Sequence, residues 1–185
     1  MLPIIHFSLI YKIDKMKIII LFFGLIPIVS FGQNINELLY LKINNYRKKH
    51  DLKTLVVEKK AKVANDQQLN YMVETSTVPL DHTQLLKSSY VSTFNSFEDR
   101  VHFVCAESFE YIGENLIGMI YENSIEITAE QIFQYWVKSP THNQLMLSTE
   151  PTGFYINYKI SNKIIVDGVT FDKYKIIYCV LTTFR

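Results

Sequence analysis

YKIIYCVLTTF, residues 174–184, is apolar on both of the faces that a β-strand presents. Successive side chains of a strand point to opposite sides of a sheet. Each side would carry three apolar residues here, Ile176, Tyr178 and Val180 on one and Ile177, Cys179 and Leu181 on the other. A strand that is buried on both faces needs a covering layer on each side. The stretch therefore predicts a central strand within a layered domain.

A second strand is predicted upstream of this one, beginning at Gly153. Apolar residues alternate with others along it, at Phe154, Ile156, Tyr158 and Ile160. The dipeptide Asp167-Gly168 lies between the two stretches and is typical of a tight hairpin turn. We therefore expect both strands to belong to one antiparallel sheet.

The layers that cover this sheet have to come from helices earlier in the chain. Asn34 and Glu37 have the spacing of a capping box, which predicts a helix from there to about His50. A second helix is predicted from about Glu58 to Val73. Its inner face would carry Ala61, Ala64, Leu69 and Met72.

Two more helices are predicted in the middle of the chain. A short capped helix is expected at residues 96–101, and Thr128 to Lys138 has apolar residues at helical spacing, with Trp136 in the core. The segment around Leu52, Leu55 and Val57 is expected to be irregular. The expected fold class is α+β, a three-layer α/β/α sandwich around a central antiparallel sheet.

The N-terminus has the layout of a secretory signal peptide. Three lysines precede the apolar run of residues 18–30, and small residues stand three positions and one position before Gln33. The run is shorter than the roughly 20 residues of a membrane-spanning helix. We expect cleavage of residues 1–32, no transmembrane segment in the mature chain, and a secreted or periplasmic protein. Met16 would be a more ordinary start, so residues 1–15 are interpreted as a misassigned beginning.

The mature part, residues 33–185, is short enough for one domain. It contains 16 basic and 17 acidic residues, which gives a net charge of −1 without any run of like charge. Nucleic acid is therefore a poor candidate partner.

Cys105 and Cys179 are the only cysteines. Export would permit a disulfide between them, and two buried free thiols are the equal alternative.

Two candidate functional residues stand out on chemical grounds. Glu114 lies within an apolar run, where a carboxylate is costly to bury without a partner. His142 follows Ser139, a good helix N-cap, and Pro140, which suits the first helical position. The positive end of a helix dipole disfavours an imidazolium there. A neutral imidazole can bind a metal or accept a proton.

These segments together resemble the CAP superfamily of cysteine-rich secretory, antigen 5 and pathogenesis-related proteins, in its bacterial SCP-like branch. The resemblance covers roughly residues 35–184 and includes Asp81-His82-Thr83, Gly113-Glu114-Asn115-Leu116 and the Ser139-Pro140-Thr141-His142 segment that follows Trp136. It implies the same α/β/α sandwich. It also implies a cleft that holds two histidines and two acidic residues and binds a divalent metal in some members.

In this sequence His82 matches the first histidine and Glu114 the first acid. Ser139 stands where the second acid usually lies, and the strand motif that carries the second histidine is missing. His142 would fill that space from a helix. The resemblance thus implies a cleft of His82, Glu114, Asn115, Ser139 and His142. His82, Glu114 and His142 are the candidate ligands for Zn²⁺, Mg²⁺ or Ca²⁺.

Three functional hypotheses remain open at this stage. The leading one is a secreted binding module whose cleft takes a small ligand, a lipid or a peptide. The alternative is a metal-assisted hydrolase or peptidase, in which Glu114 is a metal ligand or general base. The third is a structural or adhesive surface protein with a relic cleft. The missing second acid and the absence of any recognisable nucleophile favour the binding module over hydrolysis.

Overall fold

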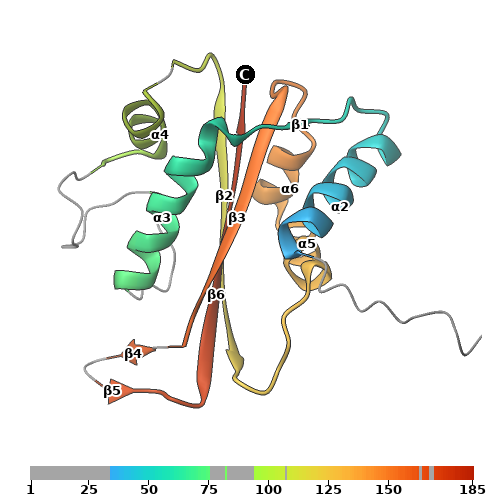
Figure 1. Cartoon of the computed structure of the whole chain (residues 1–185). Helices are drawn as coiled ribbons and strands as arrows, with labels where there is room; N and C mark the ends of the chain where they lie inside the picture. The colour runs from blue at the N-terminus through green and yellow to red at the C-terminus, as the bar shows by residue number, and fades with distance from the viewer. Residues whose placement is uncertain (1–33, 76–81, 83–93, 107, 163, 167–168) are drawn as a thin grey trace, which may run out of the picture. The chain divides into compact units, whose positions relative to one another are not determined.

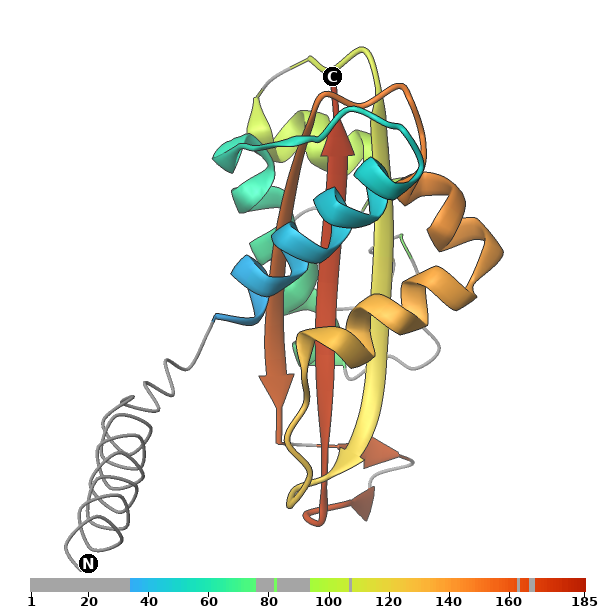
Figure 2. The same cartoon turned by 90° about the vertical axis from the view of Figure 1, so that its right-hand side faces the viewer.

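The central strand predicted at residues 174–184 is the middle of the sheet in the computed structural model, which describes residues 34–75, 82, 94–106, 108–162, 164–166 and 169–185. This strand, β6 (Tyr174–Phe184), pairs antiparallel with β2 (Ile112–Glu122) and with β3 (Gly153–Ser161). Figure 2 shows β6 between these two neighbours. The predicted strand from Gly153 is therefore confirmed.

Helices cover both faces of this sheet, as the apolar pattern of β6 requires. On one side lie α2 (Ile35–Lys49), α5 (Ala129–Lys138) and α6 (Pro140–Met146), and on the other α3 (Lys62–Thr75) and α4 (Phe97–Cys105) (Figure 1). Ile177, Cys179 and Leu181 of β6 belong to the core beneath α2 and α5. Ile176, Tyr178 and Val180 belong to the core beneath α3. The three-layer α+β architecture follows directly from the two apolar faces of one strand.

The sheet is mixed rather than purely antiparallel, which corrects one expectation. A two-residue strand, β1 (Val56–Val57), pairs in parallel with the start of β3, in the order β1-β3-β6-β2. The amide of Val56 donates to the carbonyl of Thr152, and the amide of Glu58 donates to the carbonyl of Phe154. From the sequence, this segment was expected to be irregular. A two-residue strand forms only by pairing with another strand, and its own sequence does not show that pairing.

Beyond β1, a side chain forms hydrogen bonds with the backbone at the outer edge of β3. The Tyr40 hydroxyl on α2 donates to the carbonyl of Ile156 at 3.0 Å and accepts from the amide of the same residue at 3.3 Å. Burial raises the pKa of Tyr40 to about 12, so the hydroxyl keeps its proton at neutral pH. One phenol therefore satisfies both outward-facing backbone groups of Ile156.

The predicted helices are present, with small differences at their ends. Asn34 caps α2 through the amide of Asn36, whereas the described contacts include no reciprocal bond with Glu37. The second predicted helix begins as a short 3₁₀ turn, η1 (Lys59–Ala61), and continues as α3, with all four expected inner residues fully buried. Ser96 caps α4, which extends four residues beyond the expected end. Thr128 caps α5.

Cys105 and Cys179 do not form a disulfide, so the disulfide is the wrong alternative of the two. Cys179 is buried among apolar side chains, which raises the pKa of its thiol. Cys105 lies at the end of α4.

Two expectations lie outside the described residues: the signal peptide of residues 1–32 and the turn at Asp167-Gly168. The short strands that flank that turn, β4 (Ile165–Val166) and β5 (Val169–Thr170), pair antiparallel. Among the described helices, none combines the length and the apolar character needed to cross a membrane.

Candidate functional site

Two neighbouring residues of β2 point to opposite faces of the sheet at its edge. Glu114 lies opposite Thr182 of β6, and Asn115 lies opposite Leu181. Because side chains alternate along a strand, the first faces α3 and α4 and the second faces α6. The hydrogen bonds that each side chain makes, described below, agree with this geometry.

The Glu114 carboxylate is buried and held by two side chains, those of Arg100 and His82. Arg100 of α4 donates a hydrogen bond from Nη2 to Glu114 Oε2 and another from Nη1 to Gln68 Oε1 on α3. His82 Nδ1 lies 3.0 Å from Glu114 Oε1. The side chains of Arg100 and Glu114 are both 0% exposed. The partner that a carboxylate needs in an apolar run is therefore an arginine of the neighbouring helix layer.

His82 forms the solvent-facing end of this network. Its side chain is 42% exposed, and its ring centroid lies 5.6 Å from that of Phe97 on α4. Solvent can thus reach the imidazole, whereas the carboxylate behind it is sealed from water. Any molecule that approaches Glu114 from this side meets His82 first.

On the other side of β2, α6 is tied to the strand through Asn115. The Asn115 side-chain amide donates to the backbone carbonyl of His142 at 3.0 Å. Ser139 precedes the helix and Pro140 is its first residue, as predicted. The Ser139 hydroxyl makes no cap bond and lies 3.3 Å from the Thr141 hydroxyl. Asn115 therefore fixes where the first turn of α6 lies relative to the strand.

The His142 imidazole is partly buried and favours its neutral form. Burial lowers its pKa, and the charge of His82 lowers the pKa further. The His142 ring lies 6.2 Å from that of Tyr135 between centroids. Its buried Nδ1 has no hydrogen-bond partner among the described residues. This buried ring nitrogen is therefore left with an unsatisfied hydrogen-bonding capacity.

The lowered pKa of His142 predicts an acid-sensitive fold. The unfolded chain binds a proton at His142 more readily than the folded chain, so the free energy of unfolding should fall as the pH falls below about 6.5. This contribution levels off below the folded-state pKa. Urea unfolding in EDTA at about pH 7.5 and about pH 5.5 should show a smaller acid-induced loss for His142→Gln than for the wild type. His50→Gln, at the exposed end of α2, is the control, and equal losses in all three proteins would contradict the assignment.

The structure assembles only part of the predicted site. It brings His82 to Glu114 and joins Asn115 to the turn that carries His142. Within the described part of the chain, no hydrogen bond links Glu114 to His142. His82 acts on His142 electrostatically and lowers the pKa of His142. The cleft itself remains a prediction.

The described residues do not form a metal-binding set. Across the described ranges, no group of three His, Cys, Asp or Glu side chains has the geometry to hold a metal ion. Arg100 and His82 occupy the two oxygens of Glu114. We therefore derive no chemistry through a metal, and the ligand set of His82, Glu114 and His142 stays a prediction.

Sequence reasoning missed the roles of two residues, Arg100 and Gln68. Arg100 lies within the short helix predicted at residues 96–101, and no partner was assigned to it. Gln68 stands four residues after Ala64 and four before Met72, on the predicted inner face of α3. A polar residue at a buried helical position signals a hydrogen-bonded network, and that signal could have found Gln68.

Three solved bacterial structures resemble this fold. An outer surface protein of Borrelia burgdorferi matches with a TM-score of 0.55 and 19% identity, over 80% of this chain and 92% of its own. An extracellular SCP-domain protein of Bacillus anthracis matches with a TM-score of 0.55 and 18% identity, over 82% of this chain. A cysteine-rich secretory protein of Staphylococcus aureus matches with a TM-score of 0.52 and 15% identity, over 84% of this chain.

The match spans 40% of the length of both the Bacillus and the Staphylococcus chains. At these identities the likeness concerns the fold alone. No curated protein sequence matches this chain significantly. The model of the cysteine-rich secretory protein (CAP) family matches residues 40–161. This match covers well over half of the sequence and agrees with the fold, so the chain belongs to the CAP family.

Proposed function

We propose that the protein is an exported binding module that uses the β2 edge to take a small ligand, a lipid or a peptide. The site consists of His82, Glu114, Asn115, Ser139 and His142. The observation that carries the proposal is the buried, unpartnered Nδ1 of His142, in a ring whose neutral form is favoured. A ligand hydroxyl or amide would supply the missing hydrogen bond, and the exposed His82 ring would contact the same ligand.

The environment of Glu114 supports binding rather than hydrolysis. A general base has to reach a proton of the substrate or of a water molecule. Both Glu114 oxygens are already engaged, and the side chain is fully buried. Its role is to hold Arg100 and to orient His82.

Export is supported by two independent features. The first 32 residues have the pattern of a signal peptide. The similar structures are described as an outer surface protein and an extracellular protein. The site would therefore face ligands outside the cytoplasm.

A thermal-shift screen tests the proposal directly, with palmitate, cholesterol and short capped peptides as probes. A probe at about 100-fold over its Kd should stabilise the protein by about 2.7 kcal/mol. His142→Ala should lose the shift. His50→Ala, which changes an exposed histidine directly after α2, should keep it. A screen in which no probe shifts the wild type, or in which both variants shift equally, would reject this site.

The same titration with Zn²⁺, Mg²⁺, Ca²⁺ and EDTA addresses the alternative of a metal-assisted hydrolase or peptidase. The electrostatic effect of His82, which lowers the pKa of His142, supports this alternative, because two imidazoles that influence each other could share a metal ion. The binding-module proposal predicts no shift that depends on His142. A zinc shift that disappears in His142→Ala would move the alternative ahead.

A further inference from the structure

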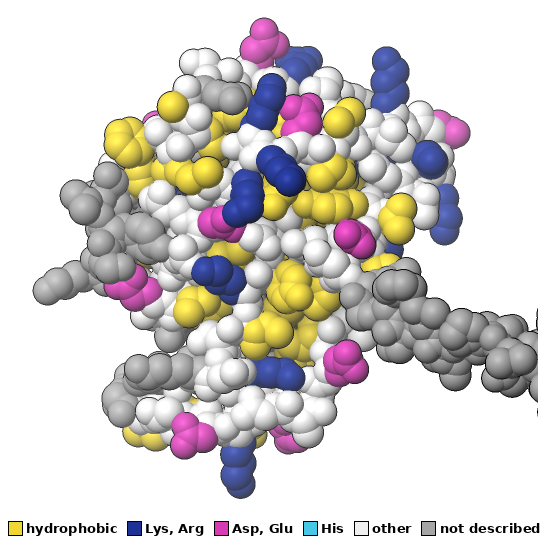
Figure 3. All heavy atoms as spheres, viewed as in Figure 1, with side chains coloured by type: hydrophobic (Ala, Val, Ile, Leu, Met, Phe, Trp, Pro, Cys, Tyr) yellow, Lys and Arg dark blue, Asp and Glu magenta, His cyan; other side chains and the backbone are white. Residues whose placement is uncertain are grey.

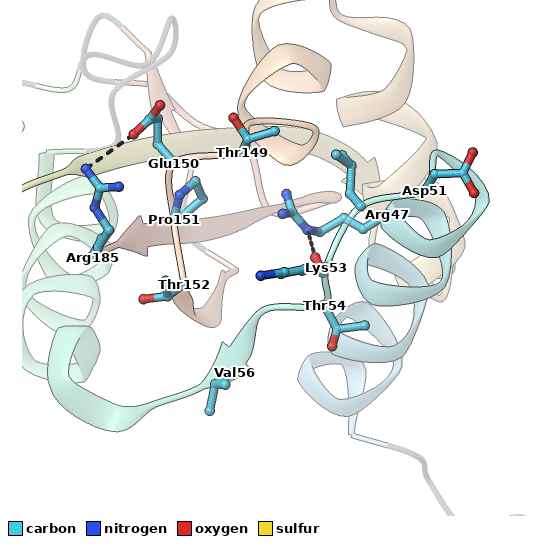
Figure 4. A pocket seen from close by; sticks show the side chains of 11 residues that line it. Arg47, Asp51, Lys53, Thr54, Val56, Thr149, Glu150, Pro151, Thr152 and Arg185 are labelled. Carbon is cyan, nitrogen blue, oxygen red and sulfur yellow. Dashed lines mark hydrogen bonds and ion pairs between the residues drawn. The ribbon is translucent and has the colours of Figure 1, made fainter.

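A pocket opens beside β1, away from the site described above. Basic side chains gather around β1 on the upper part of the face seen in Figure 3. The pocket has a volume of about 540 Å³ and lies between the loop after α2 and the loop before β3 (Figure 4). None of the five proposed site residues lines it. Its size is within the range of about 300–1,000 Å³ typical of small-molecule sites.

A buried guanidinium forms the floor of this pocket. Arg47 is 2% exposed, and burial lowers its pKa without removing its charge at neutral pH. Its Nε donates to the carbonyl of Lys53 at 2.8 Å. Its Nη1 donates to the carbonyls of Met146 and Ser148 at 2.7 and 2.8 Å. Within the described residues no carboxylate pairs with this cation.

Lys53 adds a second cation without a carboxylate partner in the described part of the chain. In Figure 4 its side chain extends across the pocket towards Thr152. The two acidic residues of the lining do not neutralise it. Glu150 Oε2 is paired with Arg185 Nη2 at 3.3 Å, and Asp51 points away from the pocket (Figure 4). The pocket therefore has an excess of positive charge.

We infer that this pocket binds a small anionic ligand through a carboxylate or phosphate group. Lys53 contacts the anion directly. The charge of the buried Arg47 guanidinium attracts it from the floor of the pocket, where burial weakens screening by water. The lining also contains the hydroxyl-bearing Thr54, Thr149 and Thr152, which can donate hydrogen bonds to further oxygens of a ligand. The inference concerns a second site and does not depend on the proposed function.

Isothermal titration with inorganic phosphate and with citrate tests this site on the full chain. Lys53→Gln should weaken the binding of at least one probe by about fivefold or more, since a charge-assisted hydrogen bond is lost. Lys48→Gln, an exposed lysine of α2 that does not line the pocket, removes the same net charge and should change the Kd by less than about twofold. Raising the salt concentration should weaken binding to the wild type.

The two probes distinguish the source of the anionic group. Tighter binding of phosphate indicates a phosphate-bearing ligand, and tighter binding of citrate indicates a carboxylate-bearing one. Equal Kd values for Lys53→Gln and Lys48→Gln would overturn the inference, and so would the absence of binding by either probe. Arg47 is unsuitable for this test because three backbone carbonyls depend on it.

Discussion

Arg100→Ala should lower the free energy of unfolding by about 3–5 kcal/mol, because it leaves the buried Glu114 carboxylate without its cation. Gln68 would also lose its partner on Arg100. Urea unfolding followed by circular dichroism measures the change. An Arg100→Ala variant that no longer shows a cooperative unfolding transition would be read as a loss at the upper end of this range.

Two further variants test whether the loss of stability comes from leaving a charge buried and unpaired, or simply from removing an arginine. Arg185→Ala removes an arginine with 45% side-chain exposure that pairs with two surface carboxylates, and should cost no more than about 1 kcal/mol. The double variant Arg100→Met with Glu114→Leu removes both buried charges and should recover most of the stability. A loss below about 1 kcal/mol for Arg100→Ala would show that Glu114 does not depend on this pair.

Trp136→Ala is the second change with a large expected effect, about 3–5 kcal/mol of unfolding free energy. Trp136 is fully buried in the core beneath α2 and α5, as its spacing predicted. Its carbonyl also accepts the Ser139 amide at the junction between α5 and α6. An alanine keeps this backbone bond, so the expected loss of stability comes from core packing.

Chemical denaturation of Trp136→Ala and of Lys138→Ala gives the comparison. Lys138 is an exposed residue two positions further along α5, so its removal should change the stability by no more than about 0.5 kcal/mol. Similar changes in unfolding free energy for the two variants would contradict the conclusion that Trp136 holds this helix on the core by packing.

Local patterns in the sequence predicted most of the fold. The two apolar faces of β6 required helices on both sides. The expected cap at residue 96 and the helical spacing of apolar residues after Thr128 predicted where two of the helices begin. The parallel strand β1 was missed because its two residues, although valine favours strands, are too few to show an alternating pattern. Its pairing depends on β3, which lies nearly a hundred residues further along the chain.

The candidate site was predictable only in part, for a related reason. An apolar context shows that Glu114 needs a partner, but the spacing of residues does not show which one. Arg100 and Gln68 come from two different helices, and only the packing of both on the same face of the sheet brings them to the carboxylate. The family resemblance indicated His82 and His142, because it carries information about tertiary position that periodicity lacks.

The hydroxyl of Tyr40 has a consequence for self-association. An open strand edge is a template on which another chain can add a strand of its own. At Ile156 both backbone groups that would receive such a strand are already bonded to Tyr40. A second molecule could extend the sheet there only by displacing the phenol, and with it the packing of α2. The first helix of the domain thus also protects the exposed side of the sheet against intermolecular β-pairing.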